Sequence, residues 1–149
     1  MPFSKLGLST PILNAINKVG YDKPTSIQEK AIPIVLEGKN LIAAAQTGTG
    51  KTASFVLPIL EMLSKGETQR KKRIRALIVV PTRELAIQVD EKIKQYAEET
   101  KLTSMAMYGG VEYQPQKQGL IDGVDVLVST PGRLIDLYGQ KAVYFEEVE

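Results

Sequence analysis

The sequence from Leu41 to Thr52 reads LIAAAQTGTGKT. The apolar residues 41–44 predict a short buried strand, and the residues from Lys51 onward predict a helix. Gly48 and Gly50 lack side chains, so the backbone between these elements can turn its N–H groups towards an anion at the helix N-terminus. Lys51 can then reach the outer phosphates of a nucleotide, and the Thr52 hydroxyl can bind Mg²⁺. The stretch therefore predicts a phosphate-binding loop, with a flexible turn and a solvated lysine as the alternative.

The composition limits the chemistry that is open to this chain. Its 149 residues, 43% hydrophobic and 24% charged, are enough for one globular domain with a core. It has no cysteine and no histidine, which excludes disulfides, thiolate metal sites and a histidine base. The net charge of +2 says little about partners. No signal-peptide core or membrane-length apolar run occurs, so we expect an intracellular, cytoplasmic protein with no membrane contact.

Strand and helix patterns alternate along the chain. Apolar runs predict strands at 41–44, 76–80, 103–107 and 124–128, and the run at 76–80 indicates a strand buried on both faces. Thr10 is expected to be the N-cap of a helix that stops at Gly20, and Ser26 to start a second helix as the N-cap of a capping box with Glu29. Further helices are expected from Lys51, after Thr82, at 116–120 and after Arg133. This alternation predicts an α/β domain with a mostly parallel sheet.

Three turns are expected to follow strands at their carboxyl ends and to open helices: the phosphate-binding loop, residues 81–83 and residues 130–133. Ligands of parallel sheets bind at this edge, and free N–H groups at helix starts attract anions. The three turns therefore indicate a polyanion beside the nucleotide. The basic residues between Lys65 and Arg75 are interpreted as a solvated surface loop rather than a nucleic-acid contact.

Taken together, these motifs resemble those of the DEAD-box family of ATP-dependent RNA helicases, over residues 3–138. The Q motif is matched by residues 20–28 with Phe3 upstream, motif I by 45–52, motif Ia by 81–86, the paired glycines by 109–110 and motif Ib by 130–133. Ala45 stands where the general phosphate loop has glycine, and the DEAD-box form of the loop usually carries alanine there. The resemblance implies a RecA-like P-loop fold, a three-layer α/β/α domain with a mostly parallel sheet, incomplete at the C-terminal end.

The resemblance also implies ATP and Mg²⁺ as cofactors and assigns roles to individual residues. The amide of Gln28 would contact the adenine edge, which offers one acceptor and one donor; from the sequence alone, a surface helix residue is the preferred interpretation. Phe3 or Tyr21 would pack on the base, where core or surface packing is the alternative. The implied nucleotide-binding residues are Phe3, Tyr21, Lys23, Thr25, Gln28, Gln46, Thr47, Gly48, Thr49, Gly50, Lys51 and Thr52, with Thr52 also the metal ligand.

RNA is the implied partner, held through its backbone as a single strand or short duplex. The implied contacts are Pro81, Thr82, Arg83, Gly109, Gly110, Thr130, Pro131, Gly132 and Arg133. For Arg83 and Arg133 a surface ion pair is the alternative, and Glu84 is near enough in sequence to compete for Arg83.

The family's acidic motif is missing. No Asp-Glu-Ala-Asp occurs in the 149 residues, and the chain ends at Glu149 before the strand that would carry it. We therefore expect residues 1–149 to be a partial first RecA-like domain, without motif II or the second RecA-like domain. Such a chain contains no catalytic residue, binds nucleotide weakly, does not hydrolyse it, and can self-associate through uncovered sheet edges.

Two other functions remain open from the sequence. One is a DNA helicase or another P-loop ATPase, against which the Gln28 motif and residues 81–86 argue. The other is a non-catalytic nucleotide- or RNA-binding module that is complete at Glu149. The preferred function is the ATP-binding part of an RNA helicase that unwinds or remodels short RNA duplexes.

Overall fold

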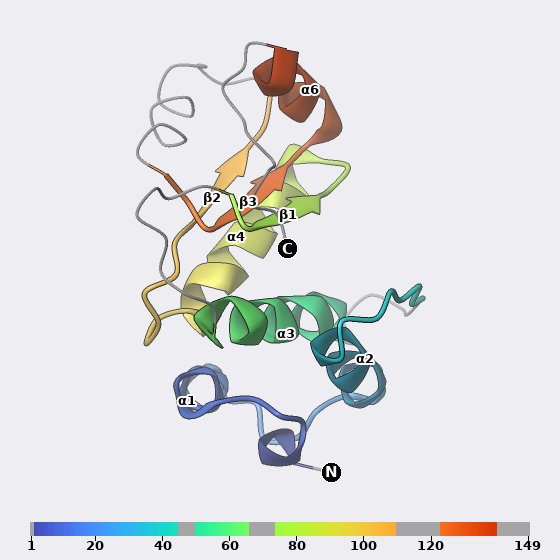
Figure 1. Ribbon diagram of the computed structural model, residues 1–149, viewed down its shortest axis with the longest axis vertical. Coiled ribbons are helices and arrows are strands. Elements are labelled where there is room, and N and C mark those ends of the chain that lie inside the picture. Colours follow the sequence, from blue (N-terminus) through green and yellow to red (C-terminus); the bar gives the residue numbers. More distant parts are fainter. Residues whose placement is uncertain (1, 45–49, 66–73, 110–122, 140–149) are drawn as a thin grey trace. The chain divides into compact units, whose positions relative to one another are not determined.

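The computed structural model describes residues 2–44, 50–65, 74–109 and 123–139 (Figure 1). The chain divides into two compact units. The first consists of Met1–Gly66 with Gln95–Lys101, and the second of Glu67–Lys94 with Leu102–Glu149.

The first unit is helical. It contains the 3-10 helix η1 (Phe3–Lys5), α1 (Thr10–Val19), α2 (Ser26–Leu36) and α3 (Lys51–Lys65), with α2 packed along α3. Its core is made by apolar side chains that these helices turn inward, among them Ile12, Ile16, Ile32, Leu57 and Leu60. The helix expected from Lys51 is confirmed, and Pro58 lies inside it.

The second unit contains a parallel sheet. Strands β1 (Ala76–Val79), β2 (Ser104–Met107) and β3 (Val126–Ser129) pair in the order β1-β3-β2, with Ala76 and Ser104 both opposite Val126. Helices α4 (Arg83–Tyr96) and α6 (Pro131–Gly139) follow β1 and β3. The expected strands at 76–80, 103–107 and 124–128 are confirmed within two residues, and so are the α/β class and the parallel sheet.

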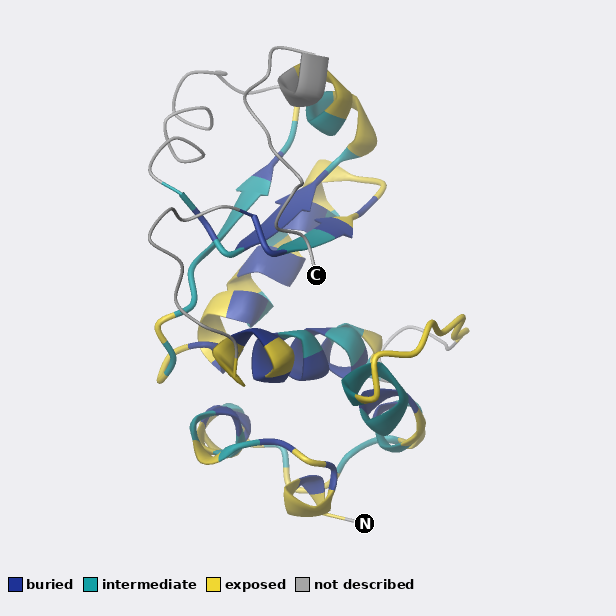
Figure 2. Cartoon of the chain, viewed as in Figure 1, coloured by how far each residue is buried: buried dark blue, intermediate teal, exposed yellow. Residues whose placement is uncertain are grey.

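The core of this sheet is centred on β3. All of its residues are buried (Figure 2), whereas β1 includes Val79, which is 51% exposed. The prediction that 76–80 is buried on both faces is therefore wrong. The continuous apolar run is equally strong in both strands, but only β3 has a described neighbour on each side.

Two N-caps were predicted one residue too late. The N-cap of α1 is Ser9, with φ −80° and ψ 166°, so Thr10 is already helical and Pro11 lies in the first turn. The N-cap of α2 is Thr25, whose capping-box partner is Gln28 rather than Glu29. The capping-box pattern fits Thr25 with Gln28 and also Ser26 with Glu29, and the burial of Gln28 favours the pair with Thr25. The predicted stop at Gly20 is confirmed, because Gly20 has φ 89°.

The predicted buried strand at 41–44 is wrong. These residues have no regular secondary structure, and Ile42 is completely exposed. A strand exists only when a neighbouring strand takes up its backbone N–H and C=O groups, and a short apolar run carries no information about such a neighbour.

Arg75 corrects the interpretation of the basic stretch. Its side chain is buried, and its backbone N–H donates to the carbonyl of Asp125 at 2.8 Å. Arg75 directly precedes β1, and its backbone pairs with the residue before β3, so Arg75 is part of the packed unit.

Residues 66–73 of the basic stretch and the helix expected at 116–120 lie outside the described residues. Within the described part of the chain, no helix is long and apolar enough to cross a membrane.

Replacing Leu127 by alanine should destabilise the second unit by about 3 kcal/mol, because Leu127 is fully buried on the central strand and its loss leaves a cavity. Urea unfolding followed by circular dichroism measures this change. The matched control is Ile135→Ala on α6, where the side chain is 71% exposed and the expected change is within about 0.5 kcal/mol. Equal losses for both variants would contradict the assignment of β3 as the core strand.

Candidate functional site

The N-terminus of α3 is the phosphate-side half of the candidate nucleotide site. Lys51 is the first helical residue and is exposed, and Thr52 is half-buried beside it. Gly50 precedes them with φ +83°, and its carbonyl accepts the first helical hydrogen bond, from the N–H of Ser54, at 3.2 Å. The exposed ammonium and the helix N-terminus provide positive charge at one point. Gln46, Thr47, Gly48 and Thr49 lie outside the described residues.

Gln28 connects the base-side segment to this helix start. Its Oε1 accepts a hydrogen bond from the N–H of Thr25 at 2.9 Å, and its Nε2 donates to the carbonyl of Gly50 at 3.2 Å. Gln28 is only 2% exposed, so the interpretation as a surface helix residue is wrong. Sequence periodicity could not reveal this burial, because the contact joins residues 22 positions apart.

Gly50 is required at this contact for two reasons. Its positive φ is a conformation that side-chain-bearing residues rarely adopt. In addition, a Cβ atom added at Gly50 would lie 2.3 Å from Nε2 of Gln28 and 3.2 Å from Oγ1 of Thr25. The backbone before α3 can therefore approach Gln28 only because position 50 has no side chain.

The remaining residues of the predicted nucleotide site differ in how deeply they are buried. Tyr21 is half-buried, and its ring lies 6.5 Å from that of Tyr96, the last residue of α4 and part of the first unit. The Tyr96 hydroxyl donates to that of Tyr21 at 3.4 Å. Burial raises the pKa of the Tyr96 phenol, and the hydrogen bond to Tyr21 raises it further, so Tyr96 stays neutral at physiological pH. Phe3 is buried in the core, and Lys23 is exposed.

The proposed RNA contacts gather at one edge of the sheet in the second unit. Residues 81–83 follow β1, Gly109 follows β2, and residues 130–133 follow β3. Because the three strands are parallel, their carboxyl ends lie at the same edge. Gly110 lies outside the described residues. The sheet thus brings together Pro81, Thr82, Arg83, Gly109, Thr130, Pro131, Gly132 and Arg133.

Local hydrogen bonds fix these turns. The hydroxyl of Thr82 accepts from the N–H of Leu85 at 3.2 Å, which confirms Thr82 as the cap of α4. The N–H of Thr130 donates to the carbonyl of Met107 at 3.1 Å, tying the turn after β3 to the end of β2. The guanidinium of Arg83 lies 5.8 Å from the centre of the Tyr108 ring, a cation–π distance that positions the charge at the sheet edge.

Sequence reasoning missed two buried carboxylates. Asp90 on α4 accepts from Ser104 Oγ at 2.7 Å and from Lys94 Nζ at 2.8 Å, which fastens α4 to β2. Glu61 on α3 is bonded to Ser9. The one signal for Glu61 was a lone charge among the apolar residues 59–63. In the part of the chain that the structure describes, no cluster of acidic residues could hold a metal ion by itself.

Comparison with known proteins identifies the family to which this site belongs. The sequence profile of the DEAD/DEAH box helicase family matches residues 25–149. This chain belongs to that family.

Similar proteins and a similar structure agree with this assignment. The ATP-dependent RNA helicase CshA of Listeria monocytogenes is 41% identical over 147 residues, 99% of this chain and 28% of that protein. The RNA helicase CrhR of Synechocystis sp. is 41% identical over 148 residues, 99% of this chain and 29% of that protein. The crystal structure of a DEAD box protein from the hyperthermophile Methanococcus jannaschii has a TM-score of 0.90 at 39% identity, covering 100% of this chain and 40% of that one. The chain thus spans less than a third of the length of CshA and of CrhR.

Replacing Gly50 by alanine should cost at least about 1 kcal/mol more stability than replacing Gly38, because only the new Cβ at position 50 meets another side chain. Both glycines have positive φ, 83° and 77°, so both variants carry the same backbone strain. Urea unfolding of Gly50→Ala and Gly38→Ala gives the difference.

The excess cost should largely disappear when Gly50→Ala is combined with Gln28→Ala, since the 2.3 Å clash with Nε2 is then removed and only the 3.2 Å approach to Oγ1 of Thr25 remains. An excess that persists in the double variant would show that Gln28 is not what confines position 50.

Proposed function

We propose that this chain is the nucleotide-binding part of an ATP-dependent RNA helicase. The observation that carries the proposal is the amide of Gln28, buried and bonded to the carbonyl of Gly50. This contact puts a side chain that can recognise adenine within one hydrogen bond of the helix start that can hold the phosphates. The start of α2, with Gln28, and the start of α3 are therefore suited to bind a molecule that carries both a base and phosphates.

Each residue of the site has a role that follows from its placement. Lys51, exposed at the start of α3, binds the β- and γ-phosphates as a point charge. Gln28 contacts the adenine edge, because each polar atom of its amide has capacity for one more hydrogen bond beyond those to Thr25 and Gly50. The half-buried ring of Tyr21 packs on the base. The buried position of Phe3 fits packing of η1 in the core, so we assign the base contact to Tyr21.

The Thr52 hydroxyl is the group on α3 that would bind Mg²⁺, with the remaining oxygen ligands supplied by phosphates and water. When bound, Mg²⁺ neutralises charge that develops on the transferring phosphate. Because no Asp-Glu-Ala-Asp occurs in the 149 residues, we infer that this chain alone binds nucleotide without hydrolysing it.

The sheet edge in the second unit is the proposed RNA site. Thr82, Arg83, Gly109, Thr130 and Arg133 would bind phosphates and sugars of a single strand or short duplex, without reading the bases. We extend the proposal to the whole protein: two RecA-like domains in the cytoplasm, the first begun by this chain, that close on RNA when ATP binds and separate short duplexes. The names of the relatives, ATP-dependent RNA helicase and RNA helicase, support this extension.

Replacing Lys51 by alanine should weaken binding of ADP with Mg²⁺ by at least about tenfold, because the site loses its charged phosphate ligand. Isothermal titration calorimetry measures the affinity. Lys39→Ala is the matched control, since Lys39 is an exposed lysine that pairs with Glu37 at 2.7 Å. Equal affinities for the two variants would exclude the α3 N-terminus as the phosphate site. Neither variant nor wild type should release phosphate from ATP, with or without RNA.

Replacing Arg83 by alanine should weaken binding of single-stranded RNA and make its salt dependence shallower by about 0.7 in the slope of log affinity against log salt, the value for one phosphate contact. Fluorescence anisotropy with two RNAs of different sequence measures both quantities. The loss should be the same for the two RNAs, because the contact is to the backbone. An unchanged slope would remove Arg83 from the RNA site; Lys101→Ala, an exposed lysine outside the sheet edge, is the control.

A further inference from the structure

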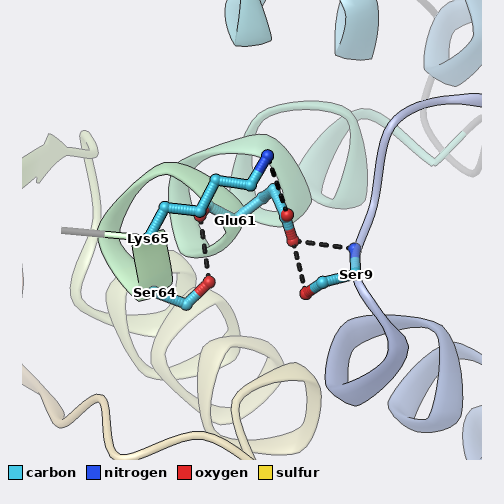
Figure 3. Close-up of polar contacts among 4 residues, drawn as sticks. All are labelled: Ser9, Glu61, Ser64 and Lys65. Atoms are coloured by element: carbon cyan, nitrogen blue, oxygen red, sulfur yellow. Dashed lines mark hydrogen bonds and ion pairs between the residues drawn. The ribbon is translucent and has the colours of Figure 1, made fainter.

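Glu61 is a buried carboxylate that the proposed function leaves without a role. It lies on α3 and is only 1% exposed. Its Oε2 accepts hydrogen bonds from the N–H of Ser9 at 2.9 Å and from the hydroxyl of Ser9 at 2.7 Å (Figure 3). Its Oε1 lies 3.3 Å from Nζ of Lys65, one turn later on the same helix. The backbone carbonyl of Glu61 also accepts from the hydroxyl of Ser64 at 2.9 Å.

The contact with Ser9 joins two helices. Ser9 is the N-cap of α1, and its hydroxyl donates to Glu61 instead of capping its own helix. The carboxylate of α3 thus stands at the N-terminus of α1, where the helix dipole favours a negative charge. A hydrophobic side chain at position 61 would fill the same buried position without desolvating a charge. Unlike such a side chain, the carboxylate accepts two hydrogen bonds from Ser9, and these bonds fix where α1 begins on α3.

Both helices lead to the nucleotide site. From Ser9, α1 runs to Gly20, and the next residue is Tyr21, the proposed base contact. From Glu61, α3 runs back to Lys51, the proposed phosphate contact. The segment after Tyr21 then returns to α3 through Gln28 and Gly50. Two partly buried polar contacts, Ser9–Glu61 and Gln28–Gly50, therefore hold the chain on either side of Tyr21 against α3 and the glycine that precedes it.

We propose that Glu61 is a positioning residue of the nucleotide site: by fixing the N-terminus of α1 on α3, it sets the place of Tyr21 relative to Lys51. The proposal rests on the proposed function, in which these two residues bind the base and the phosphates. It predicts that changes at Glu61 alter the affinity for ligands that carry a base and leave the affinity for ligands that consist of phosphates alone unchanged.

The test compares ADP with inorganic pyrophosphate, each with Mg²⁺, by titration calorimetry on wild type, Glu61→Leu and Glu61→Gln. Leucine removes both hydrogen bonds to Ser9, so ADP binding should weaken by about fivefold or more, which is part of the free energy of hydrogen bonds to a charged group. Pyrophosphate binding should stay within about twofold, because Lys51 and the helix N-terminus are unchanged. Glutamine keeps an acceptor for Ser9 and should restore ADP binding to within about twofold of wild type.

Two further variants complete the test. Ser9→Ala removes one of the two hydrogen bonds and only a small side-chain volume. It should lower the affinity for ADP by less than Glu61→Leu does, and it should leave the affinity for pyrophosphate unchanged. If Glu61→Leu does not fold, Ser9→Ala provides the test. Glu99→Gln alters an exposed contact of Asn14 on α1, 3.5 Å long, and should change neither affinity.

The outcomes separate the inference from the function on which it rests. Parallel losses of ADP and pyrophosphate affinity, or no loss of either in Glu61→Leu and Ser9→Ala, would overturn the positioning role. A wild-type chain that binds pyrophosphate and ADP equally well would overturn the role of Tyr21 and this inference with it. A wild-type chain that binds neither ligand would refute the proposed nucleotide site itself.

Discussion

The hydrogen bond between the buried amide of Gln28 and the carbonyl of Gly50 is the constraint on which the first unit depends. It holds the start of α2 against the start of α3, and it is possible only because position 50 has no side chain. The capping box of α2 and the positive φ of Gly50 are both part of this one contact. The oxygen of the same amide accepts from the N–H of Thr25, so the residue that would contact a base also completes the capping box of its own helix. In the proposed function, nucleotide binding and the local structure of α2 are therefore coupled through one side chain.

In the second unit the corresponding constraint is the central position of β3. Its pairing with β1 on one side and β2 on the other brings three turns to one edge, although they are far apart in the sequence. Asp90 strengthens this arrangement by bonding α4 to Ser104 of β2. The RNA site proposed at this edge would use contacts to phosphates and sugars from several turns, and the parallel sheet places these turns at one edge.

Buried carboxylates show where polar groups are used for geometry rather than for chemistry. Glu61 and Asp90 both lie on helices whose other buried residues are mostly apolar, and both accept hydrogen bonds from serines of neighbouring segments. Such groups contribute little net stability, because desolvation opposes the gain. Their effect is directional, since a hydrogen bond fixes an angle and a position that apolar packing leaves free.

The sequence by itself determined the α/β class, the three strands that are described, the helix from Lys51 and the stop at Gly20, because apolar periodicity and glycine conformation act over a few neighbouring residues. It also determined the family, because the motifs occur in order along the chain. Only the tertiary structure decided that β3 is central, that residues 41–44 are exposed, that Gln28 rather than Glu29 completes the capping box of α2, and that Arg75 and Glu61 are buried. Each of these depends on contacts between residues distant in sequence, and local patterns of polarity carry no record of the partner that a buried group will find.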